Sequence, residues 1–475
     1  MQTECTSKLG GLQPIGRRTL VAAFDARRMT SDGGALLLRE VDQLRHFFAR
    51  VAGCFVDHRA HTRIEHSVEE LLGQRSLGIA LGYQELNDHD DLRYDPTLAM
   101  AVGKVDPLLG NTRKLDRDRG RALAGHATLN RLETAPSTLD SDRSDLKILH
   151  SPQAFERLFV DLMLDAHDQP PNELIIDLDA TDDRVHGTQE GRSFHGYYGH
   201  DCFLPLYIFC GEFLLAAKLR RADQDGAAGS LEEVARIVAH IREQCPRTKL
   251  IVRADSGFCR DAMLDWCESQ PTVEFVIGLA RNSRLAEMIK GELEHHRQVV
   301  AESGHASQSY KDLDYRTKKS GSRERRVVAK AEVLTGKDTP RFVVTSLSAD
   351  EVDKRALYED LYCARGDMEN RLKAQQLGMF ADRTSSHTMR ANPLRLWFSS
   401  LAYVLVNDLR TVALRGTPLA KAQVWTIRVR LLKVGALVRQ SVRRLVIWLR
   451  SSLPLKAIWL AALAHIQQVR SALVF

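Results

Sequence analysis

The segment between residues 173 and 280 constrains the fold most, because few folds order their strands and helices as it does. Residues 173–179 (ELIIDLD) predict a strand that ends in acids, and apolar runs at 203–210 and 213–219 predict a hairpin around Gly211 and Glu212. Four further segments alternate helix and strand, at residues 230–244, 249–254, 260–269 and 273–280. The order is therefore strand, hairpin, helix, strand, helix, strand.

This order predicts an α/β, ribonuclease-H-like domain, in which three antiparallel strands precede strands that alternate with helices and pair in parallel. A generic α/β sheet is the alternative that the order leaves open. Residues 284–347 break the pattern with a helix and alternating segments, which predict a β-rich insertion. Residues 349–377 then predict one long helix. We therefore assign residues 166–283 and 348–385 to one domain that is interrupted by this insertion.

The two flanks of this domain are predicted to be mainly helical. In residues 1–165, Ser67 and Glu70 form a capping-box pattern ahead of an apolar run. Residues 117–132 could form a helix-turn-helix, although nothing in their spacing requires one. Residues 386–475 predict a basic region of several amphipathic helices.

Positive charge concentrates at the end of the chain. The whole chain has a net charge of +6, yet residues 381–475 hold 15 Lys and Arg against Asp382 and Asp408 alone, a net of +13. The first 380 residues therefore have a net charge of −7. Solvated helix faces are one explanation, but so large an excess favours a polyanionic partner. A second basic stretch, residues 311–330, contains eight Lys and Arg and three acids.

Other features of the sequence narrow the class of protein. The first residues, MQTECTSKLG, lack a secretory signal pattern, and no apolar run approaches the ~20 residues that span a bilayer. We therefore expect no membrane partner. The eight cysteines form no C-x-x-C pair, which argues against a zinc ribbon or a thioredoxin-like motif, and without a signal pattern we expect reduced thiols in a cytoplasm. A loose group after the first strand fits loop residues better than a zinc site, the alternative: His186, His195, His200 and Cys202.

Three acidic positions lie where such a fold could bring them together. Asp177 and Asp179 end the first strand and point to one face of it, because side chains alternate along a strand. Asp255 directly follows the strand at 249–254, at the kind of strand end where ligands commonly bind. Glu369 lies on the predicted long helix. Taken singly, these residues have simpler interpretations as loop, turn and solvated helix acids.

Glu369 shares one stripe of the predicted helix with Tyr362, Arg365 and Lys373, which all fall within roughly an 80° sector at 100° per residue. A solvated face with ion pairs one turn apart is the alternative. Carboxylates gathered from distant elements suit two Mg²⁺ ions about 4 Å apart, which can activate water and stabilise a leaving oxygen in phosphodiester cleavage.

The sequence resembles the DDE-type insertion-sequence transposases, in the group marked by the signature Tyr-x2-Arg-x3-Glu-x6-Lys. The resemblance covers residues 170–400, and a β-rich insertion before the Glu is also a feature of this group. Gln376 occupies the position of the signature Lys, and Lys373, one turn earlier, could substitute for it. The motifs that carry the resemblance are Asp179-Ala-Thr181, Asp255-Ser-Gly-Phe258 and Tyr362-Cys-Ala-Arg365-Gly-Asp-Met-Glu369.

The resemblance implies catalytic and DNA-binding roles. The catalytic residues, which would ligate two Mg²⁺ ions that Mn²⁺ can replace, are Asp179, Asp255 and Glu369. The residues that would contact DNA are Tyr362, Arg365 and Lys373. Asp179 is favoured over Asp177, because Thr181 follows it at the family's spacing. Residues 1–165 would bind transposon ends.

The implied function is DNA transposition in a prokaryotic cytoplasm, at the nucleoid. Water would first free a 3′-hydroxyl at the element end, and this hydroxyl would then attack target DNA. The partners would be double-stranded DNA, at the terminal inverted repeats and the target, and a second copy of the chain in a synaptic complex. Two alternatives remain, a ribonuclease-H-like nuclease that only cuts and a catalytically silent DNA-binding regulator. A simple nuclease needs neither the insertion nor the basic tail, and a silent regulator does not need all three acids.

Overall fold

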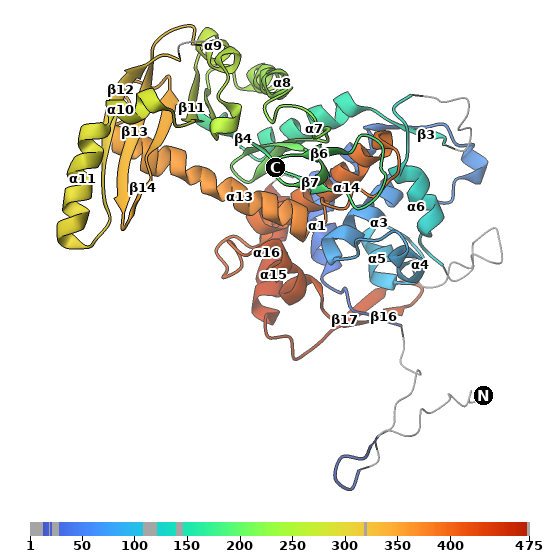
Figure 1. The fold of residues 1–475 in the computed structure, drawn as a ribbon. Coiled ribbons are helices and arrows are strands. Elements are labelled where there is room, and N and C mark those ends of the chain that lie inside the picture. The colour runs from blue at the N-terminus through green and yellow to red at the C-terminus, as the bar shows by residue number, and fades with distance from the viewer. Residues whose placement is uncertain are drawn as a thin grey trace, which may run out of the picture. The chain divides into compact units, whose positions relative to one another are not determined.

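The computed structural model describes residues 13–18, 20, 28–107, 121–138, 146–317 and 321–472 (Figure 1). The chain divides into two compact units. Unit 1 combines Met1–Ala52, Arg59–Leu132 and Asp408–Phe475, and unit 2 combines Gly53–His58 and Glu133–Asn407. Residues from both ends of the chain therefore share unit 1. Residues 108–120 lie outside the described part, and with them the first part of the suggested helix-turn-helix at 117–132.

Unit 2 is built on a mixed sheet whose strands follow the order predicted from the sequence. The five predicted strands are β4 (Glu173–Ala180), β8 (Leu206–Cys210), β9 (Phe213–Lys218), β10 (Lys249–Ala254) and β11 (Val273–Leu279). Strands β4, β8 and β9 pair antiparallel, whereas β10 pairs parallel with both β4 and β11. The predicted change from antiparallel to parallel pairing is confirmed.

The inserted residues extend this same sheet. They form α10 (Ser283–Met288), α11 (Lys290–Ser303), β12 (Ser307–Tyr315), β13 (Arg325–Leu334), β14 (Lys337–Asp338) and β15 (Arg341–Thr345). Strand β15 pairs antiparallel with β11, which gives the order β12-β13-β15-β11-β10-β4-β8-β9. The predicted β-rich character is confirmed, while the pairing with β11 depends on a long-range partner that the local pattern does not reveal.

The basic stretch at residues 311–330 contributes to this extension. Five of its cations form ion pairs within unit 2: Lys311 with Glu292, Arg323 with Glu268, Arg325 with Asp261, Asp265 and Glu268, Arg326 with Asp312, and Lys330 with Glu332. Arg325 is the most enclosed, with 5% of its side chain exposed. Acidic neighbours therefore neutralise the charge of these five residues. The positive charge of residues 311–330 thus gives little support for a polyanion bound at this stretch.

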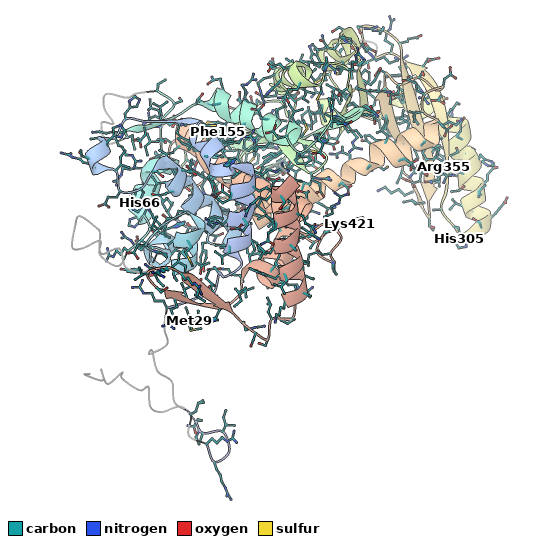
Figure 2. All side chains as sticks on the ribbon, turned by 180° about the vertical axis from the view of Figure 1, so that it is seen from behind. Met29, His66, Phe155, His305, Arg355 and Lys421 are labelled. Atoms are coloured by element: carbon teal, nitrogen blue, oxygen red, sulfur yellow. The ribbon has the colours of Figure 1, made fainter. Side chains whose placement is uncertain are left out.

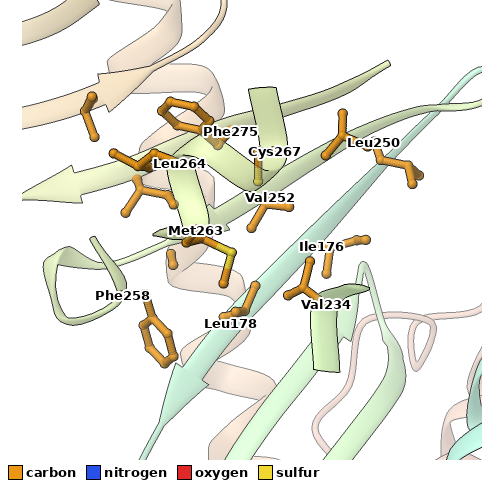
Figure 3. Packing of buried hydrophobic residues seen from close by; sticks show 14 of the residues in the cluster. Ile176, Leu178, Val234, Leu250, Val252, Phe258, Met263, Leu264, Cys267 and Phe275 are labelled. Carbon is orange, nitrogen blue, oxygen red and sulfur yellow. The ribbon is translucent and has the colours of Figure 1, made fainter. Parts of the chain in front are cut away.

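One face of the sheet is covered by helices that precede the insertion and by the helices of the insertion itself. These are α7 (Pro152–Leu164), α8 (Ser230–Gln244) and α9 (Asp261–Ser269), together with α10 and α11. Figure 3 shows Ile176 and Leu178 of β4 and Val252 of β10 lying against Val234 of α8 and Met263 of α9. Apolar residues alternate along β4, so its acids lie on the other face.

The other face of the sheet packs against the helical residues 354–378. This segment comprises α12 (Lys354–Ala356), a π-helical stretch (Leu357–Tyr362), a 3₁₀ turn (Cys363–Arg365), α13 (Gly366–Lys373) and a second π-helical stretch (Ala374–Gly378). The predicted long helix is confirmed, but it begins at residue 354 because the Asp353 side chain caps it by accepting from the Arg355 amide. Its apolar side buries Leu357 and Tyr358 against Ile251 and Val276.

Helix α14 (Asn392–Asp408), at the start of the basic tail, also lies mostly in unit 2. Trp397 donates its indole N–H to the Ala217 carbonyl at 2.9 Å, and the Tyr403 hydroxyl donates to the Glu212 carbonyl at 3.0 Å. The Trp397 ring stacks on Phe155 of α7.

Short strands complete unit 2: β2 (Phe55–Asp57), β3 (Ile148–His150), β5 (Asp183–Arg184), β6 (Ser193–His195) and β7 (His200–Phe203).

Unit 1 is mainly helical. Its helices of four or more residues are α1 (Ala35–Arg45), α2 (Phe47–Ala52), α3 (Val68–Leu81), α4 (Asp88–Leu92), α5 (Pro96–Ala101), α6 (His126–Glu133), π-helical stretches Leu409–Ala413 and Arg428–Leu432, α15 (Val424–Ile427) and α16 (Lys456–Ala472). The predicted capping box is confirmed, since Ser67 and Glu70 exchange both hydrogen bonds. Among the described helices, none is both long and apolar enough to cross a bilayer.

The tail is not helical throughout, contrary to the prediction. Strands β16 (Ala436–Gln440) and β17 (Leu445–Leu449) form a hairpin, and β16 also pairs with β1 (Met29–Thr30). Val446, Ile447 and Trp448 favour strands, and the distant partner β1 gives β16 a second set of ladder hydrogen bonds.

Candidate active site

Asp177 is a structural residue of the sheet. Arg253 lies opposite it on β10, and the two side chains pair through both oxygens, at 2.6 Å (Nε to Oδ1) and 2.8 Å (Nη2 to Oδ2). Only 2% of the Asp177 side chain and 7% of Arg253 is exposed. Arg253 also donates to the Leu361 carbonyl on the facing helix. Asp177 thus anchors the helix to the sheet.

Asp179 lies two residues further along the same face of β4. Its Oδ2 accepts from Nη1 of Arg365 at 3.1 Å, and its Oδ1 accepts from the Ala180 amide at 2.9 Å. Burial raises the pKa of Asp179 to about 6; the Arg365 guanidinium opposes this shift, and the negative charge of Asp255 adds to it. Two carboxylates therefore share this edge of the sheet.

Asp255 follows the last residue of β10, beside the end of β4. Parallel strands end at the same edge of a sheet, so the pairing of β10 with β4 explains why the two acids meet. The Asp255 Oδ1 accepts from the Gly257 amide at 2.8 Å and caps a 3₁₀ turn at Ser256–Phe258. The turn interpretation from the sequence is thus correct, and it leaves Oδ2 for other contacts.

Tyr362 packs onto this turn through a close approach at Gly278 of β11. A Cβ atom on Gly278 would lie 2.5 Å from the Tyr362 hydroxyl and 2.9 Å from the Ser256 amide nitrogen, so no larger residue fits without displacing them. Burial raises the pKa of Tyr362, with Arg365 opposing and Asp255 adding to the shift. The raised pKa keeps the phenol protonated beside Asp255 even at alkaline pH, so its O–H can serve as a donor.

Arg365 links the acids of the sheet to Glu369. Its Nη2 lies 3.8 Å from Glu369 Oε1, one turn along the helix, while its Nη1 contacts Asp179. The Arg365 side chain is 16% exposed and that of Glu369 is 57% exposed. Within the described residues, no three acidic, His or Cys side chains converge closely enough to share one metal ion. A ligand set made of Asp179, Asp255 and Glu369 therefore stays a prediction.

Gln376, at the position of the signature Lys, contacts the first motif. Its Nε2 donates to the Asp182 carbonyl at 2.9 Å and to Thr181 Oγ1 at 3.4 Å. Lys373 is exposed on α13. The sequence places Gln376 at the signature position but gives no indication of these contacts, and it offers Lys373 as the substitute cation. A long amide side chain there keeps a hydrogen-bond donor without the charge.

The loose His and Cys group does not assemble within the described residues. His200 Nε2 lies 2.8 Å from Asp182 Oδ2, the His195 ring packs against Tyr198, and Cys202 is a buried residue of β7 that lies opposite Arg184 of β5. His195, His200 and Cys202 thus each have different neighbours in or beside β5, β6 and β7.

Comparison with family models decides the family. The sequence matches the model described as "Transposase DDE domain group 1" over residues 12–471. The chain belongs to this family. Among solved structures, a chain of the "Cryo-EM structure of piggyBac transposase synaptic complex with hairpin DNA (SNHP)" is similar at 12% identity and a TM-score of 0.38, covering 85% of this chain and 81% of that chain. Likeness at that level supports no argument. Comparison with curated proteins gives no match.

In this DDE transposase family member, we expect Gln376→Leu to slow DNA cleavage about tenfold, a barrier change of about 1.4 kcal/mol. The variant loses both hydrogen bonds that tie the helix to Thr181 and Asp182, close to Asp179. Gln376→Lys keeps a donor and restores the signature residue, so its rate should stay within about threefold. Single-turnover cleavage of end DNA measures both rates. An unchanged rate for the Leu variant would show that Gln376 has no role in cleavage.

Proposed function

We propose that this chain is a transposase that cuts and rejoins DNA at the terminal inverted repeats of an insertion sequence. One observation carries the proposal: Asp179, Asp255, Tyr362 and Arg365, from three distant parts of the chain, meet at one sheet edge in a member of the DDE transposase family. Convergence of motif residues that no local pattern brings together is the main argument for a catalytic site.

The sheet supports a ribonuclease-H-like catalytic domain. Strands β9, β8, β4, β10 and β11 are neighbours in this order, with antiparallel pairing up to β4 and parallel pairing beyond it. Asp179 is the second-last residue of the central strand β4, Asp255 directly follows its parallel neighbour β10, and the helix with Glu369 packs on the same face. The inserted strands lie between Asp255 and Glu369 in sequence, and they join the sheet beyond β11, on the side away from β10 and β4.

The donor set fits two Mg²⁺ ions, which Mn²⁺ can replace. Asp255 destabilises the ionised form of Asp179, so a divalent cation between them would relieve the repulsion. Hard carboxylate oxygens are the ligands that Mg²⁺ prefers. Asp179 and Asp255 would hold the ions with Glu369 reaching in from the helix. When bound, the ions activate the attacking oxygen and stabilise the leaving oxygen.

The other residues of the site would bind and orient DNA. Arg365 presents a planar fork that suits phosphate oxygens, and it lies beside Asp179 where the scissile phosphate would sit. The Tyr362 hydroxyl, kept neutral by burial, would donate to a neighbouring phosphate. Lys373 would add positive charge from the exposed side of α13. Water attacks first, and the freed 3′-hydroxyl then attacks target DNA, with a second copy of the chain holding the other end.

Incubation of the purified chain with Mg²⁺ and DNA carrying the repeats that flank its gene tests this function. We expect cuts at the element ends, followed by joining of the freed 3′-ends to a plasmid target. Cutting without joining would identify the nuclease that only cuts. Binding without cutting, in Mg²⁺ and in Mn²⁺, would identify a silent regulator.

The Mg²⁺ requirement should rise as pH falls below about 6. The pKa of Asp179 is raised to about 6, so below that pH a proton competes with the ion for this carboxylate. We expect the Mg²⁺ concentration for half-maximal cleavage to rise roughly fivefold from pH 6 to pH 5, and to change little above pH 7. Mg²⁺ titrations of cleavage at each pH, with DNA binding measured in EDTA as control, check this. Equal requirements at pH 5.5 and 7.5 would contradict it.

A further inference from the structure

The hairpin of β16 and β17 in unit 1 carries positive charge that nothing in the fold requires. Its turn closes where the Ser441 amide donates to the Arg444 carbonyl at 2.8 Å. Residues 409–475 contain no Asp or Glu. Four exposed arginines lie on or beside the hairpin, and none of them has an ion-pair partner within the described residues: Arg439, Arg443, Arg444 and Arg450.

Three other cations of the same segment, Arg428, Lys433 and Arg470, have defined partners in unit 1. Arg428 donates to the carbonyls of Ile79 and Ala80 at the end of α3. Lys433 lies 2.7 Å from Asp32, and Arg470 lies 2.8 Å from Glu40. Unit 1 therefore holds these three cations with carboxylates or carbonyls, whereas within the described residues no carboxylate pairs with any of the four hairpin arginines.

The hairpin has two different faces. On the inner face, Val438 is buried and Gln440 donates to Asp106 Oδ1 at 3.1 Å, which fixes the hairpin to unit 1. On the outer face, Arg439 lies opposite Val446, and Leu437 lies between Trp448 and Met29 in the three-stranded register. Trp448 is 46% exposed and Met29 is 60% exposed. In Figure 2, Met29 lies beside the strands of this hairpin.

We propose that this hairpin is a DNA-contacting surface separate from the active site, in which the four arginines bind backbone phosphates and the Trp448 face enters a groove of the duplex. The assignment rests on the proposed function for the identity of the polyanion. A two-stranded ribbon fits a major groove ≈12 Å wide. Arginine forks suit phosphate, and the lack of acids in the whole segment removes repulsion.

The charge of the arginines makes the proposal measurable. The test variant is Arg439→Gln/Arg443→Gln/Arg444→Gln. The matched control, Arg157→Gln/Lys290→Gln/Arg297→Gln, removes three exposed cations that have acidic partners in unit 2. Affinity for duplex end DNA is measured in EDTA across salt concentrations. We expect the test variant to bind about tenfold more weakly at 0.1 M salt and its log–log salt slope to fall by about 2–3, at roughly 0.9 per phosphate contact. The control should keep the wild-type slope.

Three further measurements keep the outcome decisive. An Arg→Lys triple variant at the same positions retains charge and should keep most of the slope. If the Gln triple variant unfolds, Arg443→Gln/Arg444→Gln at the turn should still lower the slope by about 2. A test variant with the wild-type slope overturns the proposal. The proposal is also overturned if the Gln triple variant binds DNA as the wild type does but no longer binds phosphatidylserine vesicles. That result would identify the hairpin as a lipid-binding surface.

Failure of the hairpin assignment and of the proposed function are distinguishable, because binding in EDTA does not depend on cutting. A chain that binds DNA through these arginines but never cuts refutes the function alone. If the chain cuts and joins DNA but the arginine variant keeps the wild-type salt dependence of binding, only the hairpin assignment is wrong.

Discussion

Glu369→Gln is expected to lower DNA cleavage at least about a thousandfold while leaving end-DNA affinity nearly unchanged. The substitution removes a carboxylate and keeps the size of the side chain. Glu369 is 57% exposed and makes only a 3.8 Å contact with Arg365, so folding does not depend on it. A thousandfold loss corresponds to about 4 kcal/mol of barrier, the scale expected when a metal ligand is lost. Single-turnover cleavage and filter binding of the same DNA measure the two effects.

Glu359→Gln is the matched control, because Glu359 lies on the same helical segment. It pairs with Arg355 one turn away at 2.8 Å and is 34% exposed, so it resembles Glu369 in chemistry but not in position. Its cleavage rate should stay within about threefold of the wild type. Cutting by the Glu369 variant in Mg²⁺, or an equal loss in the Glu359 variant, would show that the carboxylate assignment is wrong.

The elements of the site were predictable because their signals are local. The apolar run of β10 ends where a polar turn begins, and the structure begins and ends this strand where the sequence predicted, at residues 249–254. Local signals alone do not show which of Asp177 and Asp179 belongs to the site. Both lie on one face of β4, and only the buried partner Arg253 shows why Asp177 is structural. That partner is 76 residues away in sequence, where no periodicity points to it.

The features missed from the sequence depend on long-range pairing. Residues 436–449 mix arginine with leucine and valine at spacings that suit a helix as well as a strand. The strand conformation is stabilised by pairing with the distant strand β1, which the local sequence does not reveal. Strand β15 joins the main sheet through β11 for the same reason. Gln376 makes its contacts from the middle of the second π-helical stretch, where side chains do not follow regular α-helical spacing.

Breaking the buried pair of Asp177 and Arg253 should produce the largest loss of stability. Asp177→Leu leaves a guanidinium that is 7% exposed without its carboxylate, and Arg253→Met leaves a carboxylate that is 2% exposed without its cation. Each single change should cost about 3–5 kcal/mol, because the remaining charge is uncompensated. The double variant replaces both charges by apolar groups and should recover most of this loss.

Hydrogen exchange of the β4 and β10 amides is the appropriate measurement, because a chain of two units need not unfold in one step. Glu243→Gln, which breaks the exposed pair with Arg157, should change protection by less than about 1 kcal/mol and serves as control. Since Arg253 also holds the Leu361 carbonyl next to Tyr362, the double variant should regain stability but not cleavage. Recovery of both would show that Arg253 acts only as a counter-ion and does not position the helix that carries Tyr362 and Arg365.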